Sequence, residues 1–233
     1  MFLFGKKKSA PITPRLDPDE ICCIIEEISD NVDKSYCILS DPGTYTLLYR
    51  DGIYLGNPQP AGGPIFPFSD DPTKMGTNSQ KKKYKIAKLV CITKDILSIP
   101  CGSPFPVIIS DPTSGKGYNL TVNGTIRADF NYSDENARTF YETLSMASAS
   151  DELDVSAVRN MCSDMISLRI AAAVQNYINE NNMPAQDLQI PINMMKVSEY
   201  IENSIDGIFD NIGLSISRGN GFTVRSMIIK EAE

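Results

Sequence analysis

The feature that most constrains this chain is a change of hydrophobic period near Ser133. Before it, apolar and polar residues alternate as they do in strands with one wet face. The clearest example is the alternation of Tyr118, Leu120 and Val122 with Asn119, Thr121 and Asn123. After it, apolar residues recur at the spacing of helices, and one strand-like segment closes the chain. This order predicts an α+β fold, because alternating βαβ units are absent.

The first part of the chain contains several strand and turn signals. Asp51-Gly52 between two β-rich runs predicts a hairpin. Residues 57–80 are rich in Pro, Gly and Ser and predict a loop, and a strand is expected over 84–93. The segment 111–117 predicts a turn between two further strands.

Three helices are expected in the second part. Ser133 caps the first, whose apolar side carries Phe140, Tyr141 and Leu144. The second spans about 154–181, and the third spans about 193–211 and stops at Gly213. The closing strand, 214–229, is interrupted at 218–221. The apolar stripe expected in the core from the second helix consists of Val155, Val158, Cys162, Met165, Ile166, Ile170, Ala173, Val174 and Ile178.

The methionines are expected to act as packing residues. Those at helical or strand core positions are Met161, Met165, Met183, Met194, Met195 and Met227. The expected organisation is a flexible basic N-terminus (1–18), a β-rich subdomain (19–131), and an α-rich subdomain with the closing strand (132–233).

Composition removes several classes of function. None of the 233 residues is histidine, which excludes Ser-His-Asp and Cys-His catalysis and His-ligated zinc or haem. The net charge of −7 argues against a nucleic-acid binder. The six cysteines form no CxxC pair, so no metal site is expected and a reducing cytoplasm is favoured. No catalytic residue and no cofactor are therefore predicted.

The segment Ser114-Gly115-Lys116-Gly117 is similar to part of a phosphate loop. That motif needs GxxxxGK followed by Ser or Thr, and then a helix. Here Ser110 stands in place of the first glycine, Gly117 replaces the hydroxyl, and no helix follows. The sequence therefore predicts a hairpin turn.

Two basic segments are candidate contact sites. The N-terminus has three apolar residues followed by three lysines, namely Phe2, Leu3, Phe4, Lys6, Lys7 and Lys8. This pattern fits either a frayed terminus or a segment that binds weakly to anionic lipid. Lys81, Lys82 and Lys83 fit either a solvated loop or a patch for a partner. No apolar run reaches the roughly 18–20 residues that span a bilayer.

One stretch carries a family likeness. It runs through Ile99-Pro100-Cys101-Gly102-Ser103-Pro104, Asp111-Pro112 before the turn, and Gly124 in the following strand. This stretch resembles the SPFH (band 7; stomatin, prohibitin, flotillin) superfamily, and most of all its soluble bacterial branch, described as virion core protein-like. The likeness extends to Asp51-Gly52, to the long helix and to the closing strand, and so covers roughly residues 20–230. The interruption at 218–221 departs from that family's pattern, in which a long heptad helix usually follows the closing strand.

The resemblance implies a curved, mainly antiparallel sheet followed by two to three amphipathic helices and a closing strand. It also implies a non-enzymatic scaffold that self-associates and organises or recruits partner proteins at the cytoplasmic membrane face. Edge strands would offer backbone for pairing between copies. The alternative that stays open is a monomeric peptide- or lipid-binding module without scaffold assembly.

Overall fold

A computed structural model of the chain describes residues 16, 20–28, 38–39, 41–56, 64–65, 85–103, 105–147, 154–217 and 220–232. The chain forms two compact units, residues 1–94 and 95–233. The described residues contain antiparallel sheets and three α-helices, which confirms the α+β class. The strands lie in more than one sheet, because the first unit has its own four-stranded sheet.

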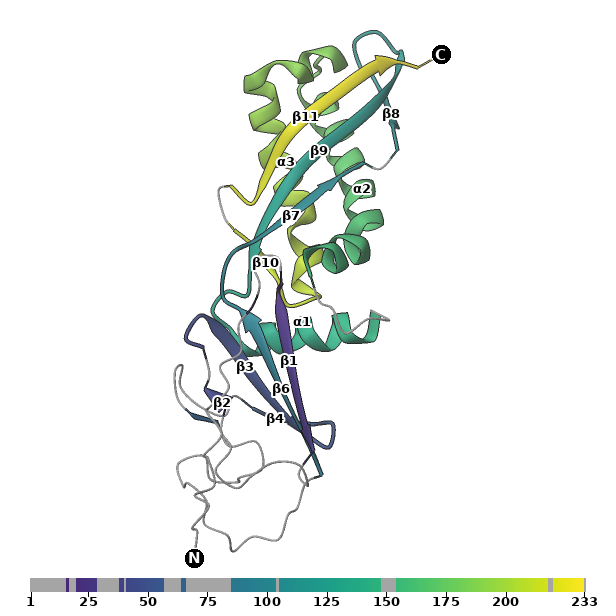
Figure 1. The fold of residues 1–233 in the computed structure, drawn as a ribbon. Coiled ribbons are helices and arrows are strands. Elements are labelled where there is room, and N and C mark those ends of the chain that lie inside the picture. Colours follow the sequence, from purple (N-terminus) through teal and green to yellow (C-terminus); the bar gives the residue numbers. More distant parts are fainter. Residues whose placement is uncertain are drawn as a thin grey trace, which may run out of the picture. The chain divides into compact units, whose positions relative to one another are not determined.

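The sheet of the first unit is antiparallel throughout (Figure 1). Its strands, in spatial order, are β1 (Cys22–Ile28), β6 (Ile86–Thr93), β3 (Thr44–Arg50) and β4 (Ile53–Gly56). A separate two-stranded ladder joins β2 (Ile38–Leu39) to β5 (Pro64–Ile65). The expected strand over 84–93 is thus confirmed as β6. Of the loop expected over 57–80, only residues 64–65 lie among the described residues.

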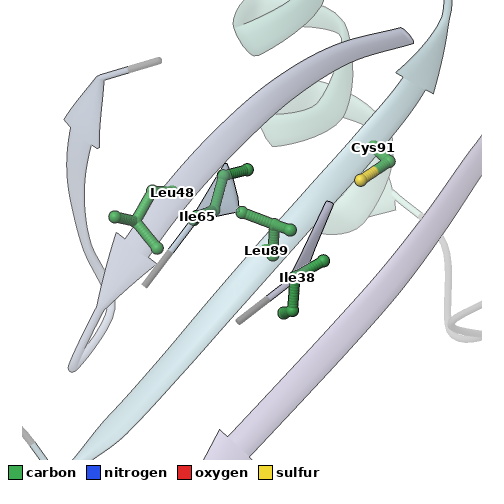
Figure 2. Packing of buried hydrophobic residues seen from close by; sticks show 5 residues of the cluster. All are labelled: Ile38, Leu48, Ile65, Leu89 and Cys91. Atoms are coloured by element: carbon green, nitrogen blue, oxygen red, sulfur yellow. The ribbon is translucent and has the colours of Figure 1, made fainter. Parts of the chain in front are cut away.

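The short ladder supplies part of the core of this unit. Figure 2 shows a cluster of buried side chains from the ladder and from β3 and β6, namely Ile38, Ile65, Leu48, Leu89 and Cys91. Each is at most 4% exposed, so aliphatic burial holds the ladder to the larger sheet.

The hairpin predicted at Asp51-Gly52 is confirmed. Both residues have positive φ, 49° and 80°, as a two-residue hairpin turn requires. The Asp51 carboxylate also accepts a hydrogen bond from the backbone N–H of Ile86, at 2.9 Å. The turn is therefore tied to the first residue of β6.

The second unit is built around one long strand, β9 (Gly117–Asp129) (Figure 1). One side of β9 pairs with β7 (Leu97–Gly102) and β8 (Val107–Ser110). The other side pairs with β10 (Ser215–Ile216) and β11 (Phe222–Glu231). The closing strand is thus confirmed, and it shares a sheet with strands that start at residue 97. The subdomain boundary expected between residues 131 and 132 lies inside this unit, just after β9.

The wet face predicted for β9 is also confirmed. Tyr118, Leu120 and Val122 are buried, whereas Asn123 is exposed on the opposite face. The buried face is the one covered by helices, as Figure 1 shows.

The helices agree with the sequence in number and type, and their ends shift by a few residues. They are α1 (Asp134–Ala147), α2 (Val155–Glu180), the short 3-10 helix η1 (Ala185–Gln189) and α3 (Pro191–Asp210). Ser133 caps α1 by accepting from the N–H of Asn136, at 3.2 Å. Gly213 follows α3 with φ +74°, and an added Cβ would collide with the carbonyl oxygen of Asn136. Glycine is therefore required at this stop.

The buried face of α2 differs from the predicted stripe at one central residue. Val158, Cys162, Ile166, Ile170, Ala173, Val174 and Ile178 are buried as expected. Met165 is half exposed, at 50%, so its assignment to the core is wrong. Met195 on α3, at 65%, is a second error, whereas Met227 on β11 is buried. Apolar residues lie on two faces of α2, and their period alone does not tell which face meets the sheet.

Candidate functional site

The two predicted contact segments lie outside the described residues. This applies to Phe2, Leu3, Phe4, Lys6, Lys7 and Lys8, and equally to Lys81, Lys82 and Lys83. Their roles stay predictions. Among the described helices, none combines the length and hydrophobicity needed to cross a membrane.

The turn that is similar to a phosphate loop is a hairpin, as predicted. Asp111 N–H donates to the carbonyl oxygen of Lys116 at 2.9 Å, closing the turn between β8 and β9. The Lys116 ammonium lies 2.6 Å from the Glu231 carboxylate, which raises the pKa of the lysine. This lysine is thus paired within its own sheet.

The described cysteines are poor nucleophiles. Burial raises the pKa of Cys91 and of Cys101 to about 12, and that of Cys162 to about 11. A thiol with such a pKa stays protonated at neutral pH, and the thiolate is the reactive form. In the described ranges, no three Cys, Asp or Glu side chains come together to hold a metal ion.

One pocket in the second unit brings polar and cationic side chains together. It has a volume of about 260 Å³ and is bounded by β7, β9, the first half of α2 and the bulge in β11. The lining residues that carry hydrogen-bonding or charged side chains are Ser103, Asn123, Thr125, Arg159, Ser163 and Arg225. Cys101 and two glycines, Gly102 and Gly124, complete much of its wall.

The backbone explains why a hollow forms there. The β9–β11 register shifts between Val224 and Ser226, which leaves Arg225 as the extra residue of a β-bulge. Opposite it, a Cβ on Gly124 would collide with the Phe222 ring, and a Cβ on Gly102 would collide with the carbonyl oxygen of Val122. Glycines at both positions therefore permit close strand packing and leave no side chains to fill the pocket.

The pocket is positively charged. Arg159 and Arg225 both line it, and none of the described lining residues is acidic. Within the described part of the chain, neither arginine has an ion pair. The Arg159 guanidinium lies near enough to Cys101 to oppose the rise in the pKa of its thiol. The lining therefore favours a negatively charged occupant.

Both edges of the second sheet are capped by side chains. On the β8 edge, the Gln175 amide accepts from Ser110 N–H at 2.7 Å and donates to Ser110 C=O at 2.9 Å, as a neighbouring strand would. Further along, Ser167 Oγ donates to the carbonyl oxygen of Gly102 at 3.0 Å, and Pro100 has no N–H to offer. At these positions the edge backbone is already bonded or lacks a donor.

The β11 edge is capped in the same way from α3 and η1. The Glu202 carboxylate accepts from the N–H groups of Gly221, at 2.9 Å, and Phe222, at 3.1 Å. Ser198 Oγ accepts from Val224 N–H at 3.2 Å. Helix side chains thus hold both edges of this sheet.

The outward side of α2 carries a row of apolar residues that the described part of the chain leaves exposed or half-buried. We call Met161, Met165, Leu168 and Ala172 the outer stripe of α2. Leu168 is 73% exposed and Met165 is 50% exposed, although both are large apolar side chains. Their spacing of four, three and four residues is that of the apolar seam of a coiled coil.

Sequence reasoning missed both the pocket and the outer stripe. Arg159 and Arg225 are far apart in the sequence, and the bulge that turns Arg225 toward the pocket leaves no clear sequence signal. The stripe residues were visible, and the spacing of Met161, Met165, Leu168 and Ala172 was the signal that could have revealed a second face.

In comparisons by sequence, no protein family and no curated protein matches the chain.

Proposed function

We propose that this chain is a non-enzymatic scaffold that self-associates and organises or recruits partner proteins at the cytoplasmic face of a membrane. The observation that carries the proposal is the outer stripe of α2, which exposes an apolar seam on a helix whose opposite face is buried. The likeness of the sequence to the SPFH superfamily favours the same function, and the protonated thiols and the absence of histidine favour a non-enzymatic role. The membrane contact rests on the sequence of the basic N-terminus.

The occupant of the stripe is a second copy of the chain. The stripe is symmetric about the point between Ile166 and Ser167. A second α2 packed antiparallel about that point brings Met165 opposite Leu168, and Met161 opposite Ala172, twice each. Such a two-fold contact uses one patch on both copies and is self-complementary.

The contact is expected to be weak by itself. A stable interface buries about 800 Å² on each partner, which is more than four side chains supply. We therefore expect association that depends on concentration, strengthened where many copies gather on a surface.

The test is the solution mass of the chain by light scattering over a hundredfold range of concentration. The wild-type mass is expected to rise with concentration, and Leu168→Glu is expected to weaken association at least tenfold. Asn203→Glu, on the exposed side of α3, adds the same charge away from the stripe and should associate like the wild type. Equal association of Leu168→Glu and wild type would contradict the role of the stripe. A wild-type chain that is monomeric at every concentration would favour the peptide- or lipid-binding module instead.

A further inference from the structure

We propose that the pocket bounded by β7, β9, α2 and the β11 bulge binds a small oxyanion, a phosphate or carboxylate group, between Arg159 and Arg225. This inference does not depend on self-association, because neither arginine belongs to the outer stripe. It assigns a ligand site to a chain for which catalysis is not expected.

The first support is charge. Two guanidinium groups line one small pocket in a chain of net charge −7, and the lining that the structure describes contains no carboxylate. Like charges brought together at a partly enclosed site repel each other, and a bound anion removes that repulsion. The planar guanidinium also offers paired N–H donors that match the oxygens of carboxylate and phosphate.

The second support is a buried hydroxyl without a partner. Thr125 lines the pocket and is 7% exposed, and its Oγ1 has no hydrogen-bond partner among the described residues. A buried hydroxyl is costly to leave unsatisfied, so such groups call for a specific explanation. An anion in the neighbouring pocket provides one when the Thr125 side chain rotates its hydroxyl toward that anion.

The neighbouring polar groups fit the same ligand. Ser103 Oγ accepts from Val122 N–H at 3.0 Å, which leaves its own proton free to donate. Asn123 lies on the exposed face of β9, where its Nδ2 donates to Ser226 Oγ at 3.2 Å. Ser103 is therefore the buried hydroxyl that the sheet positions in advance.

Size and reactivity limit the class of ligand. A volume of about 260 Å³ lies just below the roughly 300–1,000 Å³ of pockets that take drug-sized molecules. The thiol of Cys101, with its raised pKa, is protonated and does not attack a bound group. The proposed role of the pocket is therefore the binding of a small anion.

The test is calorimetric titration of the full chain at low salt with inorganic phosphate and, separately, with succinate. At least one of them is expected to bind saturably at one site per chain. The Arg159→Gln/Arg225→Gln double variant should bind that anion at least tenfold more weakly. Arg127→Gln, which removes an exposed arginine of β9 outside the pocket, is the matched control and should bind like the wild type.

Thr125→Val provides a second variant that keeps the shape of the side chain. It should weaken binding several-fold and leave the thermal midpoint of the ligand-free chain unchanged or higher, because an unsatisfied hydroxyl is removed.

The comparison of the two anions identifies the source of the oxyanion. Preference for phosphate indicates a phosphorylated ligand, and preference for succinate indicates a carboxylate. The proposal is overturned if neither anion binds, if Arg127→Gln loses as much affinity as the double variant, or if Thr125→Val and the double variant both bind like the wild type.

Discussion

The Asp111 carboxylate accepts four hydrogen bonds. Its Oδ1 accepts from Thr113 N–H at 2.7 Å, from Thr113 Oγ1 at 2.6 Å and from Ser114 N–H at 3.0 Å. Its Oδ2 accepts from Ala185 N–H at 3.0 Å. One buried carboxylate therefore fixes the β8–β9 turn and ties it to the start of η1.

These bonds lower the pKa of Asp111 well below its usual range, and the Thr113 hydroxyl has the largest effect. A carboxyl whose folded pKa is lowered stabilises the fold above its unfolded pKa of about 3.9, and that stability is lost as the pH falls toward the folded pKa. Stability from Asp111 is thus complete at neutral pH and shrinks below about pH 4.

Asp111→Asn should reduce the free energy of unfolding by about 2 kcal/mol at pH 7, because an amide N–H₂ would face the N–H of Ala185. Urea unfolding at pH 7 and near pH 3 measures the effect, and the difference from wild type should narrow at the lower pH. Asp206→Asn, an exposed carboxylate on α3, is the control and should change little at either pH. A difference for Asp111→Asn that is absent at pH 7, or equal at both, would contradict the assignment.

The capping of the second sheet shows how helices and strands stabilise each other. Gln175 replaces a neighbouring strand at Ser110, and Glu202 does the same at Gly221 and Phe222. At these three positions helix side chains occupy backbone groups that a further strand would otherwise use.

Gln175→Ala is expected to lower the free energy of unfolding by about 1–2 kcal/mol, because it leaves the N–H and C=O of Ser110 without their partners. The variant should also aggregate faster on warming than the wild type, since part of an edge becomes free. Asn176→Ala, at the next and exposed position, is the control in both the urea and the turbidity measurement. If the two variants behave alike, the Gln175 amide does not protect the edge.

The sequence predicted those elements that local signals define. Asp51-Gly52, the Ser133 cap and the stop at Gly213 each specify a backbone conformation within a few residues, and all three are confirmed. The alternation around Leu120 also identified the buried face of β9, because a side-chain period of two separates the faces of a strand.

The features that could not be predicted from the sequence depend on contacts between segments that are distant along the chain. The bulge at Arg225 exists because the pairing register between β11 and β9 shifts between Val224 and Ser226. The sequence of one strand does not reveal the register in which it pairs with another strand. Met165 was assigned to the core because apolar residues cover more than one face of α2, and burial is decided by where the sheet lies. The candidate site and the exposed stripe therefore both required the folded chain.

At the scale of the whole molecule, the chain consists of two compact units, and each unit has its own β-sheet. In the second unit, capped edges leave the outer stripe of α2 as an apolar surface suited to a second copy. The pocket lined by Arg159 and Arg225 does not include the residues of that stripe.

The most direct test of the antiparallel α2 pair is disulfide trapping between two single-cysteine additions, Met161→Cys and Ala172→Cys. In the two-fold register these positions face each other across the pair, whereas identical positions lie about 16 Å apart along the helix axis. A disulfide needs Cα atoms within about 7 Å. We predict a cross-linked dimer when the two variants are mixed under mild oxidation, and none above the wild-type background from either variant alone. No cross-link in the mixture, or equal cross-linking of each variant alone, would contradict self-association through this face.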